Sequence, residues 1–574
     1  MKLNTFTSLT LNQSMYDHHT FELVVGHDII EDLGSHVLDR SRSWIGKDFT
    51  LLFGDNVFMG IVTAISMDHQ AGLNGDLVIS GASPTILLDA GEHRQSWNER
   101  HLKWIVEEVA ETVGLKTAVA PAFKGFIDYM AQYGESHFDF LKRLAVTYHE
   151  WMYYDGRKLV FGKPSGGGAP LQVVYGTDLD HVQVTMRALP VRRKAYSYQS
   201  GRDETIQSEA SGHIAGLDSL GAEALSASTD RFALVPQGPM PTRVTDKQGL
   251  DKALQQQYAA DAARLSALSG SGTAMALRPG VVADISAAVR LGKAWELKKY
   301  GKYVVTDIRH HFTGIDHYHN SFTAVPAGLD VLPAPRIQMP HAEPELATVV
   351  SSEDPDNQGR VQVRFFWQDK SMTSSWLRVM TNDAGKSDKV GTNRGMVTIP
   401  EEGDQVMVGY RYGDPMRPFV MGSLFHGASG GGGGQGNKTK SITTRSGNTV
   451  TFDDDSGSIT IKDSRDGSVS MDGKGNIAIG SGTSITLSTG KSSITLLSDG
   501  TIAIEGKNIL VTGSESTVMM TGGSSFSTDP KEATVSARTV NVSGSKEVSV
   551  NGGMKTSISS TGKVALSGAK VTLN

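Results

Sequence analysis

The stretch Asn476–Glu505 decides the fold of the C-terminal part of this chain; it reads NIAIGSGTSITLSTGKSSITLLSDGTIAIE. Its large aliphatic residues come in pairs two positions apart, and the pairs recur about every eight residues with Gly, Asp or Ser between them. A spacing of two predicts a strand with one buried face, and Gly and Asp favour the turns that join strands. Many short strands at a fixed period indicate a repeat architecture.

The same pattern extends over residues 441–574, which hold no Trp, Tyr, His or Cys. Each repeat offers only about two large apolar side chains, so one chain alone would have a very thin core. Burial contributes roughly 25 cal/mol per Å², against an ordering cost of about 1–2 kcal/mol per residue. Three chains wound around one axis would bury the pairs at the centre, with strands pairing between chains, whereas the alternative is a single-chain β-solenoid. We expect the trimer, with these axis residues: Ile477, Ile479, Ile485, Leu487, Ile494, Leu496, Ile502 and Ile504.

Composition sets limits on the function. The 574 residues contain no cysteine and carry a formal net charge of −6. Disulfides and thiolate metal sites are therefore excluded, and non-specific binding to nucleic acid or anionic membrane is disfavoured. The N-terminal sequence MKLNTF lacks the pattern of a secretory signal, and no apolar run is long enough for a membrane span. We expect synthesis in the cytoplasm and export by a route without a cleavable signal.

A Gly-rich run, 427–437, separates the repeats from residues 341–426 and reads as a flexible linker. The region before it alternates strands and tight turns and predicts an OB-fold barrel. Its expected strands are Ala347–Val350, Arg360–Trp367, Ser375–Val379, Gly395–Pro400, Asp404–Tyr410 and Pro418–Leu424.

The motifs of this barrel carry a specific resemblance. The segments DNQGRVQVRFFWQD, SSWLRVM and GMVTIPEEGDQVMVGYRYGDPMRPFVMGSLFHG resemble the OB domain of VgrG proteins, the spikes of type VI secretion systems and relatives of phage tail spikes. Residues 438–448 look like the entry to that family's triple-stranded β-helix. In residues 133–144, YGESHFDFLKRL, Ser136 can cap a helix, with Asp139 three residues on. Residues 151–154 and 158–162 read as a hairpin, and further strands are expected at Phe21–Val25, Phe49–Phe53, Gly60–Ile65 and Gly75–Ser80. Residues 133–144 and this hairpin are similar to the family's hub region, and residues 1–340 would then form a base of β-barrels with a helical insert. We find no motif in residues 165–335.

The resemblance implies a mechanical, non-enzymatic function. Three hubs would form a base matching an Hcp-like tube, among baseplate proteins, and three C-terminal segments would form a needle that punctures a target envelope. A PAAR-like tip protein carrying effectors would bind the blunt end, at Lys570, Val571, Thr572, Leu573 and Asn574. The spike would be secreted or injected, with no stable membrane insertion and no cofactor. A contractile phage tail or an extracellular injection particle would use nearly the same architecture, and the sequence does not separate these.

Candidate chemical sites are weak. The cluster His310, His311, His317 and His319 has a spacing that fits a hairpin metal site, but neighbouring strands with polar side chains outward explain it better. The acidic run 453–455 lacks the rest of a calcium loop. The one G-x-S-x-G match, 427–431, lies in the linker without the strand–turn–helix of a nucleophile elbow. Single-stranded nucleic acid could be recognised by basic and aromatic residues of the barrel, namely Arg360, Arg364, Phe366, Trp367 and Trp376, but the acidic net charge disfavours this.

Two other classes of function stay open on the sequence. A β-solenoid polysaccharide-degrading enzyme would need acidic residues in a groove and aromatic sugar platforms, yet residues 441–574 contain no Trp or Tyr. An adhesive fibre would need a receptor-binding knob at the C-terminus, and the repeats continue to the last residue. The spike therefore remains the preferred interpretation.

Overall fold

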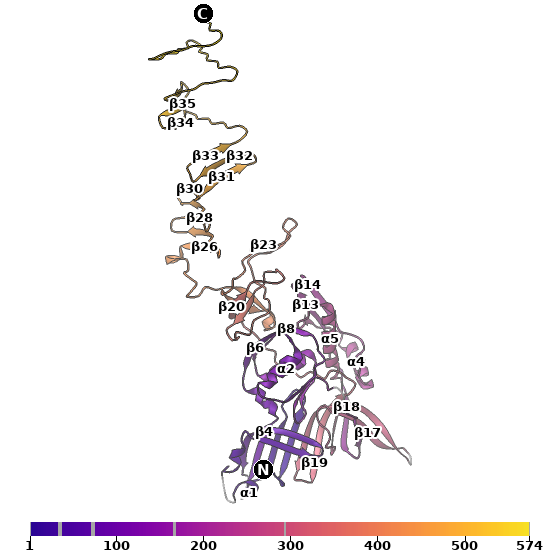
Figure 1. Ribbon diagram of the computed structural model, residues 1–574. Coiled ribbons are helices and arrows are strands. Elements are labelled where there is room, and N and C mark those ends of the chain that lie inside the picture. The colour runs from indigo at the N-terminus through magenta and orange to yellow at the C-terminus, as the bar shows by residue number, and fades with distance from the viewer. Residues whose placement is uncertain (1, 33–36, 70–74, 165–167, 292–293, 573–574) are drawn as a thin grey trace. The chain divides into compact units, whose positions relative to one another are not determined.

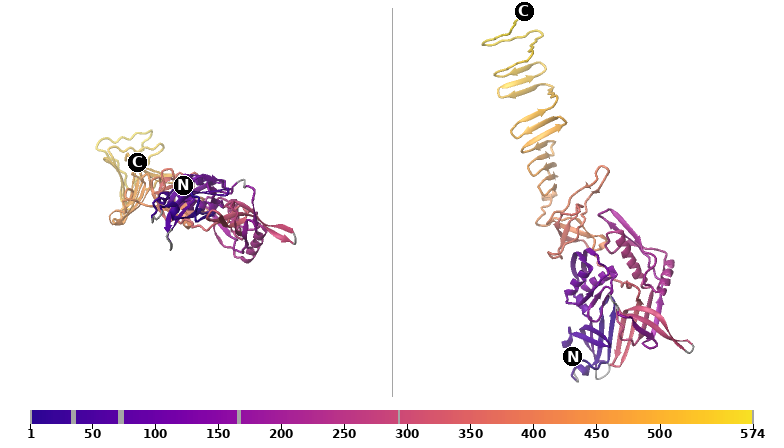
Figure 2. Two further views of the ribbon diagram at one scale, coloured as in Figure 1. Left: turned by 90° about the horizontal axis from the view of Figure 1, so that it is seen from below. Right: turned by 45° about the vertical axis from the view of Figure 1, so that its right-hand side comes forward.

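The computed structural model of the chain describes residues 2–32, 37–69, 75–164, 168–291 and 294–572. Two compact units make up the chain, residues 1–426 and residues 427–574. The first contains all the α-helices of the described residues, and the second is built mainly from short strands and turns (Figures 1 and 2).

The base of the first unit is an eleven-stranded sheet that forms two barrel-like halves. Its strand order is β17-β11-β12-β16-β19-β18-β1-β2-β5-β4-β3. The strands span β1 (Ser8–Ser14), β2 (Thr20–Gly26), β3 (Asp48–Phe53), β4 (Asn56–Asp68), β5 (Asp76–Ala82), β11 (Leu171–Tyr175), β12 (Leu179–Met186), β16 (Ser266–Gly272), β17 (Val282–Leu291), β18 (Ala294–Thr313) and β19 (His317–Pro326). The short helix α1 (His27–Ile30) follows β2.

Strand β18 belongs to both halves of the sheet. Val304 pairs with Val282 of β17 and with Val325 of β19, so these strands lie on opposite edges of β18. Further along, residues 307–313 pair with β1. Pairing of β17 with β18 closes one barrel around Leu268, Ile285 and Phe322, and β1–β5 curve around a second core that includes Phe21 and Phe58.

A helical insert packs on the sheet. The elements are β6 (His93–His101), α2 (Leu102–Glu111), β7 (Thr117–Val119), β8 (Phe126–Glu135), α3 (His137–Tyr148), β9 (Met152–Tyr154) and β10 (Leu159–Phe161). As predicted, Ser136 caps α3: its Oγ accepts a hydrogen bond from the Asp139 N–H at 3.0 Å. In the same motif the buried Arg143 donates to both carboxylate oxygens of Glu135, with Nη2 2.6 Å from Oε1, and to the carbonyl of Ala131. The expected β9–β10 hairpin is present.

Residues 165–335, in which we find no sequence motif, contain a second helical insert. Helices α4 (Ser219–Arg231) and α5 (Lys247–Ala262) accompany the small sheet of β13 (Lys194–Gln199), β14 (Glu204–Glu209) and β15 (Gln237–Pro239). Asp218 and Asp246 cap the two helices by accepting backbone N–H bonds. Leu250, Leu254 and Tyr258 place one face of α5 in a separate apolar core.

The predicted barrel contains fewer regular strands than expected. A four-stranded sheet, ordered β21-β20-β24-β25, contains β20 (Glu345–Ser351), β21 (Gln362–Phe365), β24 (Gln405–Tyr410) and β25 (Pro418–Ser423). Two of the predicted segments do not form regular strands, so the prediction is wrong there. Ser375–Val379 contributes only isolated bridges, Val361 with Leu377 and Val379 with Val420. In Gly395–Pro400 only Gly395 is in a strand, because β23 (Arg394–Gly395) pairs with β22 (Ala384–Gly385) in an exposed hairpin.

Glu345, the first residue of β20, is one of the residues that link the barrel to the helical insert. Its carboxylate accepts hydrogen bonds from Arg94 Nη1 at 3.1 Å, Trp367 Nε1 at 2.8 Å and the hydroxyl of Tyr133. Burial and the neighbouring carboxylate raise the pKa of Tyr133 to about 12. Charge-assisted bonds of this kind are stronger than neutral ones, so Glu345 is a major link between the two parts.

The second unit is a ladder of antiparallel strands in three successive sheets (Figure 2). They contain β26 (Thr439–Thr443), β27 (Thr449–Asp453), β28 (Ser458–Lys462), β29 (Ser468–Met471) and β30 (Ile477–Gly480); β31 (Ser484–Thr489), β32 (Ser492–Leu497) and β33 (Ile502–Glu505); and β34 (Thr517–Thr521), β35 (Ser524–Thr528) and β36 (Ala533–Ser536).

Two features of the ladder differ from the sequence-based prediction. Each of these strands pairs with its sequence neighbour in the same chain, where we expected pairs between chains. Beyond Ser536 the described residues contain no strand, although the paired apolar positions continue there. The turns between paired strands are two to five residues long, so pairing with the sequence neighbour has the smallest loop-closure cost within one chain.

Candidate functional site: the apolar face of the strand ladder

The first sheet of the ladder gathers its apolar side chains on one face. The cross-strand register places Ile442 opposite Val450, Val450 opposite Ile461, Ile461 opposite Val469, and Val469 opposite Ile479. Because side chains alternate along a strand, a second row lies on the same face two residues away. That second row contains Phe452, Ile459, Met471 and Ile477.

The second sheet repeats this design with the predicted axis residues. Ile485, Leu496 and Ile502 form one cross-strand row, and Leu487, Ile494 and Ile504 form the other. The third sheet has one such row, Met519, Phe526 and Val535. Directly opposed side chains of this kind are the stabilising unit of a sheet.

The opposite face of the ladder is polar. Ser441, Thr451, Thr460 and Ser470 stand in register across β26–β29, and Thr486 faces Thr495 across β31 and β32. Hydroxyl groups can remain hydrated at no cost, so this face needs no partner. The ladder thus has one face suited to water and one suited to burial.

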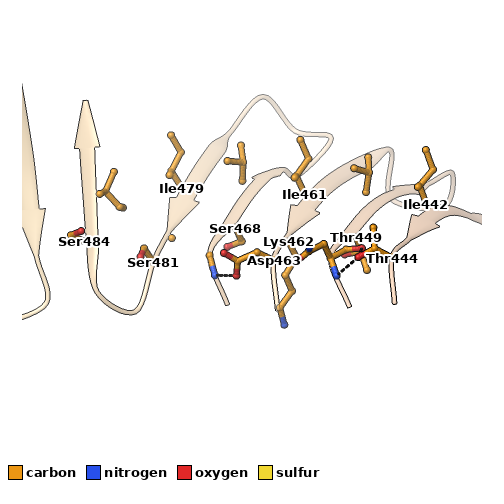
Figure 3. Close-up of a pocket in the computed structure, with 16 residues that line it drawn as sticks. Ile442, Thr444, Thr449, Ile461, Lys462, Asp463, Ser468, Ile479, Ser481 and Ser484 are labelled. Atoms are coloured by element: carbon orange, nitrogen blue, oxygen red, sulfur yellow. Dashed lines mark hydrogen bonds between the residues drawn. The ribbon is translucent and has the colours of Figure 1, made fainter. Parts of the chain in front are cut away.

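The turns are stabilised by aspartates. Asp463 Oδ1 accepts from the N–H group of Gly467 at 2.8 Å (Figure 3) and from that of Arg465, also at 2.8 Å. Asp472 Oδ1 accepts from the N–H groups of Lys474 and Asn476. These side-chain hydrogen bonds stabilise the backbone of the turns. They hold each strand at a fixed distance from the next and so keep the apolar rows aligned.

The apolar face is a shallow groove of about 450 Å³ along β26–β31. Ile442, Ile461 and Ile479 point to the same side of the ladder in Figure 3. In the single chain these rows are open to solvent: Ile477 is 67% exposed and Ile502 is 66% exposed. A continuous exposed apolar strip of this kind marks an association surface.

The eight predicted axis residues all lie on this face. Six of them stand in direct cross-strand register, and Ile477 and Ile479 follow in β30. Their proximity to a three-fold axis stays a prediction. Of the predicted tip-binding residues, Lys570, Val571 and Thr572 are exposed, whereas Leu573 and Asn574 lie outside the described residues.

The histidine cluster of the hub is divided between two environments. His311 and His319 are opposite each other across β18 and β19, but His311 contacts Thr10 and Thr313 while His319 Nε2 lies 2.9 Å from Asp180. No group of three potential metal ligands occurs in the described part of the chain. His310 departs from the expected outward orientation, because its side chain is completely buried.

His310 belongs to a buried hydrogen-bond chain. His19 Nε2 lies 3.2 Å from the Ser14 carbonyl, which can only accept, so His19 Nδ1 must accept from Gln13 Nε2. Gln13 Oε1 then accepts from His310 Nε2 at 3.1 Å, and His310 Nδ1 accepts from the Tyr318 hydroxyl at 2.7 Å. Every link is satisfied with both imidazoles neutral. Burial accordingly lowers the pKa of His19 to about 3 and that of His310 to about 3.

The structure also brings together one set of residues that sequence reasoning missed. Asp89 Oδ2 is 2.8 Å from His18 Nε2, and His18 Nδ1 is 2.7 Å from Thr85 Oγ1. The order carboxylate, imidazole, hydroxyl resembles a nucleophilic triad, but Thr85 is 1% exposed and also contacts Ser83. The set therefore ties the connection between β1 and β2 to the short 3-10 helix Pro84–Asp89 that follows β5. No local spacing predicts it, because Asp89 and His18 are 71 positions apart.

The residues proposed for nucleic-acid binding do not converge. Arg360 is engaged by Asp354 and Asp356, with Nη2 2.6 Å from a carboxylate oxygen of each. The guanidinium holds the pKa of Asp354 well below its usual range. Arg364 donates to backbone carbonyls and Trp367 donates to Glu345, while Phe366 is exposed. Trp376 is half-buried. These side chains mainly stabilise the barrel.

Two known protein families match successive segments of the first unit. Residues 37–315 match the phage tail baseplate hub (GPD) family. Residues 345–425 match the type VI secretion system/phage-baseplate injector OB domain. Together these matches cover both helical inserts, the OB sheet and the strands of the large hub sheet other than β1, β2 and β19.

Curated relatives share a segment of this chain. The type VI secretion system spike protein VgrG5 of Pseudomonas aeruginosa is 37% identical over 118 residues, 19% of this chain and 14% of the relative. The actin cross-linking toxin VgrG1 of Vibrio cholerae is 31% identical over 122 residues, 20% of this chain and 11% of the relative. The chain thus spans less than a fifth of the length of the relatives it matches.

The fold is similar to that of one chain in a solved complex of PdpA with VgrG. The Francisella PdpA–VgrG complex in its half-lidded form gives a TM-score of 0.50 at 8% identity, covering 83% of each chain. Within the described residues no helix is both long and apolar enough to cross a lipid bilayer.

Proposed function

We propose that this chain, which contains a phage-tail hub domain and an injector OB domain and is similar to VgrG proteins, is the trimeric spike of a type VI secretion system. The observation that carries the proposal is the two-faced ladder. Its apolar rows are exposed in one chain, and its hydroxyl face is compatible with water. Three ladders packed with their apolar faces together would form a three-sided needle with a dry axis.

The energetics favour such an assembly. Fully burying one large aliphatic side chain contributes roughly 1.5–3 kcal/mol, and the ladder repeats two such positions in most strands. Because each chain already makes its own strand pairs, trimerisation adds apolar burial without first ordering the backbone. The ladder edges and residues 537–572 would supply the pairs between chains that give an intertwined tip.

The proposed partners follow from this architecture. The hub would contact an Hcp-like tube and baseplate proteins, and Lys570–Asn574 would contact a PAAR-like tip protein carrying effectors. In this proposal the protein is not an enzyme. In the triad-like set of the hub, the hydroxyl that would have to act as the nucleophile belongs to the buried Thr85. The toxin activity named for the Vibrio relative belongs to a protein of which only 11% is matched.

Two measurements test the proposal. Light scattering of the purified full-length chain should give the mass of three chains, and electron microscopy should show one needle on one base. In the producing bacterium, deletion of the gene should abolish release of the tube protein into the medium, and a plasmid copy should restore it. A monomeric full-length chain would contradict the spike. Unchanged tube release would point instead to a phage tail or an extracellular particle.

A further inference from the structure

A cavity of about 580 Å³ lies within the first unit, where several of its parts meet. Residues within 122–130 and 143–148 of the first helical insert form one wall, and residues within 239–256 of the second insert form another. The lining is completed by residues 339–341 and by residues within 412–417, which connect β24 to β25. Cavities of this size at the junction of packed parts commonly hold small ligands.

The wall of this cavity is largely apolar. It contains four methionines, Met130, Met240, Met339 and Met416, together with aromatic side chains such as Phe126. Met130 and Met240 are buried, whereas Met339 and Phe126 are exposed. Methionine side chains are flexible and polarizable, so they adapt to apolar groups of different shape. Methionine and phenylalanine side chains donate no hydrogen bonds, so the wall suits an aliphatic chain better than the amide groups of a peptide.

Several charged groups of the lining already have partners inside the chain. Arg143 is bound to Glu135, as described above. Asp414 Oδ2 lies 3.0 Å from Arg417 Nε, and the Arg417 guanidinium also donates to the Met240 carbonyl. These groups hold the wall together and are not free to bind a ligand's charge in full.

The remaining charges leave a surplus of cations at the opening. Arg243, Lys252 and Asp128 line the cavity, are exposed and form no ion pair among the described residues. Asp246 is occupied as the cap of α5. Burial lowers the pKa of the Arg417 guanidinium, and the positive charge of the nearby Arg243 acts in the same direction. An anion bound beside these cations would relieve their mutual repulsion.

We propose that this cavity binds an amphipathic monocarboxylate of the fatty-acid class. Its aliphatic chain would lie against the methionine wall, and its carboxylate would lie between Arg243 and Lys252. Hydrogen bonds from arginine or lysine to a carboxylate are charge-assisted and therefore strong. A ligand here would contact both helical inserts and the OB segment, so binding should stabilise the first unit as a whole. The inference concerns the hub and does not depend on the proposed trimer.

Sodium decanoate, used below the concentration at which it forms micelles, is the probe for the full-length chain. Calorimetric titration should give one molecule per chain, and the affinity should rise about fourfold for each CH₂ added from octanoate to decanoate. 1-Decanol has the same chain without the charge, and it should bind at least tenfold more weakly. Decanoate should also raise the temperature of the tryptophan-detected transition.

Variants assign the binding to this cavity. Arg243→Glu combined with Lys252→Glu should weaken decanoate binding about tenfold at low salt and leave decanol binding unchanged. Arg202→Glu combined with Arg231→Glu is the matched control, because both residues are exposed, belong to the same insert and lie outside the lining. Ala253→Trp, which fills the cavity from α5, should prevent the binding of both compounds.

Folding and mass of each variant are checked by tryptophan fluorescence and light scattering, and the charge variants decide alone if Ala253→Trp does not fold. Absence of saturable decanoate binding to the unmodified chain would overturn the proposal. Equal binding to the two double variants would overturn it too, because the ligand would then occupy another surface, such as the ladder. A peptide ending in two leucines that binds more tightly than decanoate would assign the cavity to a protein partner and would also overturn it.

Discussion

The hub strands and the ladder strands carry the same alternation of apolar and polar residues, but they bury it differently. In the hub, Phe21, Leu23 and Val25 of β2 are at most 4% exposed, because the sheet curves back over them. In the ladder, Ile502 and Ile504 of β33 are 66% and 51% exposed. The comparison teaches that a period of two identifies the face to be buried, but not whether the same chain or another chain covers it.

The largest expected effect is on association through the ladder. Ile494→Asp places a charge in the centre of the apolar face, where an unpaired buried carboxylate costs several kcal/mol per chain. We expect the trimer to be lost or greatly weakened, with the mass of one chain in light scattering. Thr495→Asp is the matched control one residue away on the hydroxyl face, and it should keep three chains. If Ile494→Asp still formed a trimer, the apolar face would not be the surface through which the chains associate.

The second expected effect is confined to the hub. Arg143→Met leaves the buried carboxylate of Glu135 without its guanidinium, which should cost about 3–5 kcal/mol. Tryptophan fluorescence isolates this effect, because all seven tryptophans precede the ladder. The hub transition should move to lower temperature while the mass stays at three chains. Adding Glu135→Gln removes the isolated charge and should recover part of the loss; no recovery would argue against the ion pair as the cause.

The smallest expected effect is that of lowering the pH by one unit. His19 and His310 are neutral in the folded hub, with pKa values lowered to about 3 by burial, while the unfolded chain titrates near the usual 6.5. Between these values the unfolded state binds more protons, so hub stability should fall with decreasing pH from about 6.5 towards 3. Each imidazole contributes about 1.4 kcal/mol per pH unit at most.

The acid effect can be assigned with two variants. His310→Asn should flatten the dependence of the tryptophan-detected transition on pH. His319→Gln, which changes an exposed side chain, should leave the dependence as it is. If both variants behave like the unmodified chain, the buried pair does not set the acid sensitivity.

Much of the architecture could be predicted from sequence because the deciding signals are local. The i, i+2 pairs, the Ser136 cap and the strands Phe21–Val25 and Phe49–Phe53 depend on residues close in the chain, and the structure contains them. The OB segment was recognised through motifs around its tight turns. Strands at Gly395–Pro400 and beyond Ser536 were predicted from alternation alone, and there the alternation was not sufficient.

What the sequence by itself determined is the polarity of each strand and the places where the chain turns, since both follow from side-chain periodicity and turn chemistry. Only the tertiary structure decided which strands pair, that β18 is shared by both barrel halves, and that His310 meets Gln13 across 297 positions. Such contacts join residues that are far apart in the sequence, and a local sequence pattern cannot predict them.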